Sequence, residues 1–334
     1  MRELTISKND AGQRLDKFLT KALCNIPPAL LYKAIRKKKI KVNRHRAEGG
    51  QMLAVGDTLQ LFLPEDSFPA VAGEKETPNL ARVVPRLSLL YEDENILLLH
   101  KRPGVLVHED GDGEGDTLLL HLQAYLYQKG EYDPAAEQSF APSLCNRIDR
   151  NTGGIVIAAK NAEALRVMNE KIRTGEVHKY YLCAVHGVPQ PHEALLCGYL
   201  VKNSAENTVR VYDEKPREKN AKEIRTRYRV LAEKNGDALL EIALLTGRTH
   251  QIRAHMAHIG HPLWGDGKYG VNREDRARGY KFQALYAYRL AFDFTGESGV
   301  LAYLSGRQFV IPPEEIYFTA EFPGCRKEVS HGHS

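Results

Sequence analysis

The spacing of apolar residues along the first 63 positions predicts a small unit of helices and strands. Over residues 14–23 the apolar side chains recur at helical spacing, after a turn that Asp10 or Gly12 can begin. Pro28 can open a second helix, whose apolar and basic side chains face different sides. Alternating apolar positions then predict short strands over residues 40–42, 53–55 and 59–63. We therefore expect two helices packed on a small sheet.

A second, larger region contains many strand-like runs and few helices. The strands are predicted over residues 87–91, 96–100, 154–159, 179–185, 194–201, 208–212, 224–232, 239–245 and 284–292. The helices are predicted over residues 117–128, 161–173 and 249–259. Many consecutive strands with few helices between them favour an antiparallel or mixed sheet over a doubly wound one. The predicted fold class is therefore α+β: a small domain of helices and strands followed by a larger domain with a mixed, mainly antiparallel sheet.

Prolines and acidic residues mark the boundary between these two regions. Pro64, Pro69, Pro78 and Pro85 cannot continue a helix or a central strand. We therefore expect a first domain over residues 1–66, a linker over 67–86, a second domain over 87–326 and a flexible tail over 327–334. A linker of this composition also predicts that few contacts join the two domains.

Composition excludes several classes of protein. Apolar residues make up 43% and charged residues 27% of the 334 positions, which is ordinary for a globular chain. No apolar run approaches the roughly 18 residues of a membrane helix, and the first residues lack the apolar stretch of a signal peptide. The five cysteines are far apart and never spaced Cys-x-x-Cys, which favours reduced, mostly buried thiols. We expect a cytoplasmic monomer with no membrane partner.

The positive charge is concentrated in the first domain. Residues 1–63 hold 13 Lys and Arg against 5 Asp and Glu, whereas the remainder holds 34 against 37. A basic block on a small folded unit indicates a polyanion binder, and a solvated helix face is the alternative. The candidate polyanion-binding residues in this block are Lys33, Arg36, Lys37, Lys38, Lys39 and Lys41.

Three polar segments of the second domain are candidates for chemistry. They are residues 144–160, residues 178–181 and residues 245–270. Taken singly, each has a structural explanation, since an Asp beside glycines is usually a turn residue. The glycine-rich loops that cradle nucleotides are absent, so no cofactor is expected. His250, His255, His258 and His261 could suggest a metal enzyme, but they lack the spacing of a zinc site, and surface or RNA-contacting histidines are the alternative.

Together the three segments resemble the motifs of the RluA-type pseudouridine synthases. Residues 146–154, Asn-Arg-Ile-Asp-Arg-Asn-Thr-Gly-Gly, are similar to the family motif His-Arg-Leu-Asp-x-x-Thr-Ser-Gly. Residues 179–181 complete Lys-x-Tyr, and residues 247–255 read Gly-Arg-Thr-His-Gln-Ile-Arg-Ala-His before Gly-His-Pro-Leu-Trp-Gly-Asp at 260–266. Lys101-Arg102-Pro103-Gly104 and Lys222-x-x-x-Thr226-x-Tyr228 resemble further family segments. Residues 14–63 separately resemble the S-four-type RNA-binding domain.

The resemblance implies an RNA isomerase that uses no cofactor. Asp149 would attack or deprotonate the ribose of the target uridine, and Arg253 would pair with Asp149 and favour its ionised form. Tyr181, the second of two adjacent tyrosines, would pack beside the base and take part in its deprotonation at carbon. Arg147 would enter the RNA where the uridine has flipped out, and Arg248 and His250 would contact RNA as well. The RNA partner expected from the resemblance is large-subunit ribosomal RNA.

The chain departs from the family motif around the aspartate. Asn146 stands where His is usual, and Asn151 and Gly153 replace the usual Asp and Ser. We expect altered hydrogen bonding in this loop rather than lost chemistry. The alternative function is a non-catalytic RNA-binding or ribosome-assembly factor on the same fold.

Overall fold

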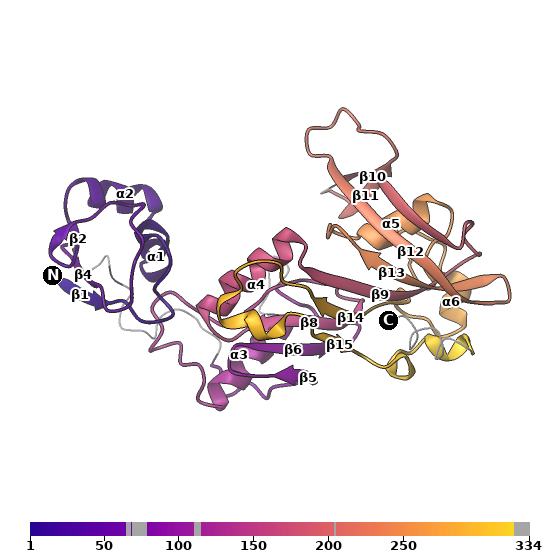
Figure 1. Ribbon diagram of the computed structural model, residues 1–334, viewed down its shortest axis with the longest axis horizontal. Coiled ribbons are helices and arrows are strands. Elements are labelled where there is room, and N and C mark those ends of the chain that lie inside the picture. The colour runs from indigo at the N-terminus through magenta and orange to yellow at the C-terminus, as the bar shows by residue number, and fades with distance from the viewer. Residues whose placement is uncertain (65–67, 69–78, 110–114, 204, 324–334) are drawn as a thin grey trace.

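The N-terminal unit contains two helices packed on one side of an antiparallel sheet. The computed structural model describes residues 1–64, 68, 79–109, 115–203 and 205–323 (Figure 1). Within them, the strand order of this sheet is β1-β4-β2-β3. The elements are β1 (Arg2–Thr5), α1 (Leu15–Ala22), α2 (Pro28–Arg36), β2 (Ile40–Val42), β3 (His45–Arg46) and β4 (Thr58–Leu61). Phe18, Leu31 and Leu59 are buried between helices and sheet, so the expected packing is confirmed.

One predicted strand of this unit is wrong. Residues 53–55 form no strand, and Met52 makes only an isolated bridge with Arg14. The reason is that backbone groups of residues 49–53 bond to residues 12–16 at the start of α1 instead of to the sheet. Val55 is consequently exposed, although it lies in an apolar pattern.

The second domain is built on a long, mainly antiparallel sheet. In the described part of the chain it has 11 strands, in the order β11-β10-β12-β13-β9-β14-β8-β6-β5, with β15 on β14 and β7 on β8. Only the β14–β8 pair among these is parallel, which confirms the predicted mixed α+β class. The strands are β5 (Leu89–Glu92), β6 (Ile96–Lys101), β7 (Ser143–Leu144), β8 (Gly153–Ala159), β9 (Val177–Val185), β10 (Glu193–Asn203), β11 (Thr208–Tyr212), β12 (Lys222–Lys234), β13 (Asp237–Leu244), β14 (Leu285–Phe292) and β15 (Gln308–Val310).

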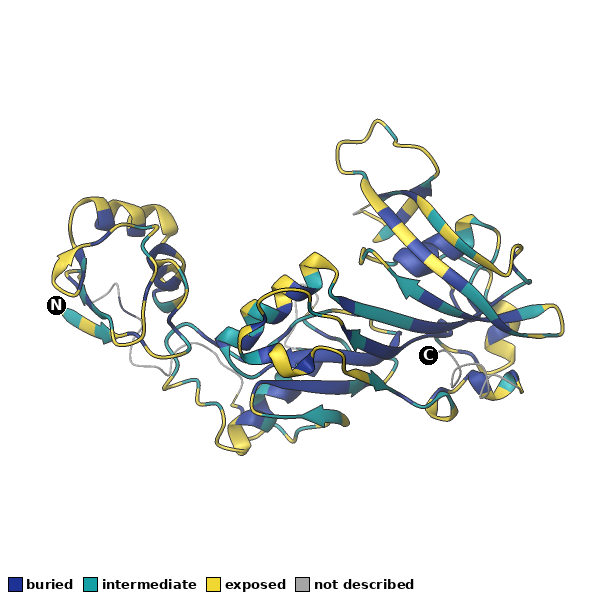
Figure 2. Cartoon of the chain, viewed as in Figure 1, coloured by how far each residue is buried: buried dark blue, intermediate teal, exposed yellow. Residues whose placement is uncertain are grey.

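Helices cover both faces of the central strands. They are α3 (Leu118–Gln128), α4 (Ala162–Thr174), α5 (Gln251–His258) and α6 (Arg273–Ala277), with the short 3-10 helices η2 (Gly299–Leu304), η3 (Pro313–Glu315) and η4 (Thr319–Glu321). One core contains Met168 of α4 and Leu301 of η2, and the opposite core contains Leu122 of α3 and Met256 of α5. Strand β8 is buried along its whole length, which explains its continuous apolar sequence. Figure 2 shows the contrasting alternation of buried and exposed residues along β12.

A glycine pair brings β8 and β14 close together beside the predicted active-site loop. Tyr286 and Ala287 of β14 pair with Gly153 and Gly154. A Cβ atom on Gly154 would lie 2.2 Å from the carbonyl oxygen of Ala287, and the φ of this residue is +121°. Only glycine fits such an approach. Because Ala287 also pairs with Tyr181 of β9, the strand order places Tyr181 next to the loop that precedes β8.

A few hydrogen bonds join the two domains. Asp10 accepts a hydrogen bond from the Ser139 hydroxyl at 2.7 Å, and the Asn9 amide donates to Glu137 at 2.7 Å. Gln138 donates to the carbonyl oxygen of Thr5 at 2.8 Å. These bonds link residues 5–10 of the first domain to residues 137–139 of the second. Most of the predicted linker, and the tail over 327–334, lie outside the described residues.

Two further sequence predictions concern membranes and cysteines. No helix in the described ranges has the length and apolar character needed to cross a membrane. Of the cysteines in these ranges, Cys183 is buried and Cys145 half-buried, whereas Cys24 and Cys197 are exposed. The expectation of mostly buried thiols therefore fails for the last two, which lie at a helix end and on the outer face of β10. Cys325 is outside the described residues.

Candidate active site

The loop between β7 and β8 carries Asp149 and is joined to β8 by the side chain of Asn146. The amide oxygen of Asn146 accepts a hydrogen bond from the backbone N–H of Ile157 at 2.7 Å. The N–H of Thr152 bonds to the carbonyl oxygen of Asp149 at 3.0 Å and closes the turn. The side chain of Asp149 is 25% exposed, so its carboxylate is accessible at the surface of the domain. Asn146, the departure from the family motif, thus anchors this loop.

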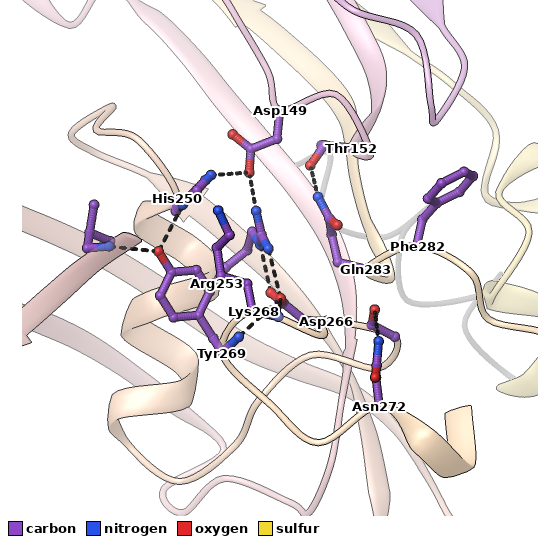
Figure 3. A network of polar contacts seen from close by, with 12 residues as sticks. Asp149, Thr152, His250, Arg253, Asp266, Lys268, Tyr269, Asn272, Phe282 and Gln283 are labelled. Atoms are coloured by element: carbon purple, nitrogen blue, oxygen red, sulfur yellow. Dashed lines mark hydrogen bonds and ion pairs between the residues drawn. The ribbon is translucent and has the colours of Figure 1, made fainter. Parts of the chain in front are cut away.

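Arg253 lies between two carboxylates. Its Nη1 donates to Oδ2 of Asp149 at 2.9 Å, while Nε and Nη2 donate to the two oxygens of Asp266 at 2.6 and 2.8 Å (Figure 3). Burial alone would lower the pKa of Arg253, but the two carboxylates outweigh burial and raise it. The structure therefore brings together the pair that the resemblance implies, and the guanidinium is a fixed positive charge beside Asp149.

Asp266 was not recognised as a site residue from the sequence. It is buried, and burial would raise its pKa, but Arg253 and the backbone N–H groups of Lys268 and Tyr269 lower it. The signal that could have identified it is the Gly-Asp pair that ends residues 260–266. Gly265 is required there, because a Cβ atom would lie 2.3 Å from the carbonyl oxygen of Phe282.

Tyr181 and Tyr180 point to opposite faces of the sheet. Tyr181 is buried on the face that α5 covers, in the same core as Ile252 and Met256. Burial and the negative charge of Asp149 both raise the pKa of Tyr181, so the phenol stays protonated at neutral pH. The ring of Tyr180 instead stacks under the Arg289 guanidinium, 3.7 Å away. The choice of Tyr181 over its neighbour agrees with this arrangement.

The buried side chain of Lys101 supports the Asp149 loop. Nζ of Lys101 donates to the carbonyl oxygens of Arg102, Val105 and Arg150 at 3.2, 2.9 and 2.8 Å. Burial lowers the pKa of Lys101 to about 7, and the charge of Asp149 acts in the opposite direction. The N–H of Gly104 also donates to the carbonyl oxygen of Arg150 at 2.9 Å. The segment Lys101–Gly104, which resembles a segment of the family, thus holds the loop that carries Asp149.

The predicted RNA-binding residues fall into two groups. Arg147 is exposed two residues before Asp149, and Arg248 is exposed just before α5. The basic residues of the first domain lie on α2 and the turn into β2, at the other end of the molecule in Figure 1. Across the described ranges none of them forms an ion pair, and all are exposed except the half-buried Lys41; they are Lys33, Arg36, Lys37, Lys38, Lys39 and Lys41. Only the first group lies near Asp149.

The four clustered histidines have separate partners. His255 bonds to Thr226 at 3.0 Å, and His258 pairs with an aspartate on the loop after β11 at 2.9 Å. His261 bonds to a backbone carbonyl, and His250 faces Asp149. Among the residues that the structure describes, no group of three or more His, Cys, Asp or Glu could hold a metal. The histidines therefore do not form the shared cluster on which the metal-enzyme alternative depends.

Comparisons with known proteins place the chain in a family. Residues 95–258 match the family model described as RNA pseudouridylate synthase. The chain is 32% identical over 309 residues to ribosomal large subunit pseudouridine synthase C of Yersinia pestis, covering 88% of this chain and 89% of the relative. The Escherichia coli K12 protein of the same name is 33% identical over 300 residues, covering 87% of this chain and 88% of the relative.

Solved structures show the same fold. The structure of human RNA pseudouridylate synthase domain containing 1 is 24% identical, with a TM-score of 0.51, and the match covers 64% of this chain and 82% of the human chain. A second human structure, domain containing 4, has the same TM-score at 22% identity and covers 67% of this chain and 87% of that one. The extent of the sequence matches decides the family: this chain belongs to the RNA pseudouridylate synthases, enzymes that isomerise uridine in RNA to pseudouridine.

Proposed function

We propose that the chain modifies uridines in the RNA of the large ribosomal subunit, with Asp149 as its catalytic carboxylate. The relatives in Yersinia and Escherichia are named for that subunit and align along nearly their whole length. The observation that carries the catalytic assignment is the ion pair between Asp149 and the buried Arg253, formed directly beside Tyr181. The basic first domain adds positive charge, which suits binding to a large polyanion such as ribosomal RNA.

The reaction is an isomerisation, and it needs no external atoms or electrons. The bond from ribose C1′ to N1 of uracil breaks, the base turns, and C1′ bonds to C5. The proton on C5 is lost and N1 gains one, so no redox partner is consumed. Asp149 either attacks the ribose or removes a ribose proton, and both steps need an ionised carboxylate. Arg253 faces Asp149 at 2.9 Å, and because the pKa of the guanidinium is raised, its positive charge is retained at neutral pH.

Tyr181 and Arg147 supply contacts to the flipped nucleotide. Tyr181 lies on the Asp149 side of the sheet and offers an aromatic face to the base. Removing a proton from C5 would require its phenolate, which burial and Asp149 both disfavour, so packing and O–H donation are the roles its surroundings support. Arg147 is exposed beside the site and can fill the space that the base leaves in the RNA.

The non-catalytic alternative rested on Asn146, where the family has His. In this chain the Asn146 amide makes a structural hydrogen bond that holds the Asp149 loop to β8. The substitution therefore has a role that is compatible with catalysis.

Mapping of pseudouridine in cellular RNA tests the proposed function. Ribosomal and transfer RNA from cells with and without the gene would be compared at nucleotide resolution, and the gene would then be restored. We expect specific large-subunit positions to lose pseudouridine without the gene and to regain it on complementation. Changes confined to transfer RNA would refute the ribosomal assignment, and unchanged RNA would refute the proposed activity.

A further inference from the structure

His250 has an unusual backbone conformation that turns its ring toward Asp149. It caps the N-terminus of α5 with φ of 53° and ψ of 18°, in the left-handed region. Non-glycine residues adopt this conformation rarely, and it is worth a functional explanation when they do. The side chain is only 10% exposed, and Nε2 lies 3.9 Å from Oδ2 of Asp149. A residue that the sequence suggested as an RNA contact is therefore mostly enclosed within the site.

Tyr269 and Asp149 contact the two nitrogens of the His250 ring. Nδ1 of His250 lies 2.8 Å from the hydroxyl of Tyr269, and that hydroxyl oxygen accepts the backbone N–H of Val209 at 2.9 Å (Figure 3). Nε2 faces an oxygen of the Asp149 carboxylate, which can only accept, so the ring proton belongs on Nε2 and Nδ1 accepts the O–H of Tyr269. The neutral imidazole then carries its proton on Nε2, the nitrogen that faces Asp149.

Burial and the surrounding charges together keep the His250 ring neutral. Burial lowers the pKa of His250, and the carboxylate of Asp149 opposes that effect. Arg253 and Lys268 lower the pKa further, while Asp266 raises it. The net direction is downward, so the imidazole is uncharged at neutral pH.

We propose that His250, oriented by Tyr269, is a positioning residue that directs one particular oxygen of Asp149 to the substrate. Both N–H groups that face the carboxylate, Nη1 of Arg253 and Nε2 of His250, are directed at Oδ2. Oδ1 accepts no hydrogen bond from the described residues. Oδ1 is thus the oxygen that reacts with ribose. This inference rests on the proposed role of Asp149.

The distance from His250 to Asp149 leaves room for closure. At 3.9 Å the contact is electrostatic, and a hydrogen bond would need the two atoms to approach by about 1 Å. Catalytic hydrogen bonds are often long before substrate binds and shorten in the complex. Bound RNA that excludes water from the site would strengthen the contact.

Single-turnover kinetics of full-length variants test the proposal. With ribosomal RNA at saturating concentration, H250A should form pseudouridine about 10- to 100-fold more slowly while binding RNA within about threefold of wild type. H250Q should recover part of the rate, because its amide N–H can occupy the position of Nε2. Y269F should lower the rate less than H250A. The double variant should be no slower than H250A, since Tyr269 acts through His250.

A matched control and thermal melts make the result decisive. His192 is an exposed histidine paired with Glu233 at 3.2 Å, and H192A should leave both rate and affinity unchanged. Melting temperatures identify any variant that fails to fold. If H250A does not fold, the rates of H250Q and Y269F test the proposal. Weaker RNA binding with an unchanged saturating rate would make His250 an RNA contact and overturn the proposal. Wild-type rates in H250A would also overturn it. Wild-type activity in an Asp149→Asn protein would instead refute the proposed function itself.

Discussion

Replacing Arg253 with lysine tests whether the geometry of the guanidinium, beyond its charge, holds Asp149. Arg253 makes one hydrogen bond to Asp149 and two to Asp266, all between 2.6 and 2.9 Å. The three nitrogens belong to one planar guanidinium group, and they donate to two different carboxylates. A lysine ammonium keeps the charge but is a single point, so it cannot bridge the two carboxylates in the same way.

The size of the effect follows from the bonds that the substitution removes. A lysine at this position would lack at least one charge-assisted hydrogen bond, worth about 1.5 to 3 kcal/mol. If the ammonium pairs with the buried Asp266, then Asp149 loses its fixed partner. Since about 1.4 kcal/mol corresponds to a tenfold change in rate, we expect a decrease of about 10- to 100-fold.

The assay is single-turnover pseudouridine formation at saturating RNA, together with RNA affinity and a thermal melt. Arg289→Lys is the matched control, because Arg289 is equally buried and paired with Glu241 at 3.0 Å, but stacks on Tyr180 on the opposite face of the sheet. Both variants should lose stability, and only Arg253→Lys should lose rate at retained affinity. Equal rates for the two variants would refute the reasoning.

Three other predictions concern the Asp149 loop, acid stability and the first domain. Asn146→Ala removes the acceptor for the N–H of Ile157, and denaturant titration should show a loss of about 1 to 3 kcal/mol in the free energy of unfolding; no loss would mean that the loop is held otherwise. Burial and the charge of His258 lower the pKa of His255 to about 4. The unfolded chain therefore takes up this proton near pH 6.5, and stability should be complete above that pH and fall by about 3 kcal/mol as pH drops to 4; a His255→Gln protein should lack this part of the slope, and an identical slope would contradict the assignment. Deleting residues 1–66 should weaken RNA binding and flatten its salt dependence by about 0.7 for each single-strand phosphate that the first domain neutralises, whereas an unchanged salt slope would make the basic block a solvated surface.

Much of the fold could be predicted from local pattern. The alternation at residues 208–212 predicted the bounds of β11, and the helices predicted to begin at Thr117 and Asn161 begin one residue later, with these two side chains as their N-caps. The failure at residues 53–55 has a physical reason, since an apolar alternation reports a buried face and not its hydrogen-bond partner. There the backbone of residues 49–53 bonds to the start of α1.

The site was only partly predictable for a related reason. Asp149 and Arg253 lie 104 positions apart, and their pairing was expected from motif resemblance rather than from any local pattern. Lys101 supports the loop by donating to backbone carbonyl oxygens. Every residue has such an oxygen, so the sequence does not indicate which ones Lys101 contacts. Tyr269 acquires its role only because folding brings Val209 and His250 to its hydroxyl.

The central claim is that the Asp149 carboxylate performs the isomerisation. Asp149→Asn keeps the size of the side chain and removes its charge, and Asp213→Asn serves as a control at an exposed aspartate that pairs with His258. Single-turnover pseudouridine formation would be measured for both proteins at saturating large-subunit ribosomal RNA. The account predicts no detectable product from Asp149→Asn at near wild-type RNA affinity, and wild-type behaviour from Asp213→Asn. Formation of pseudouridine by Asp149→Asn at the wild-type rate would contradict it.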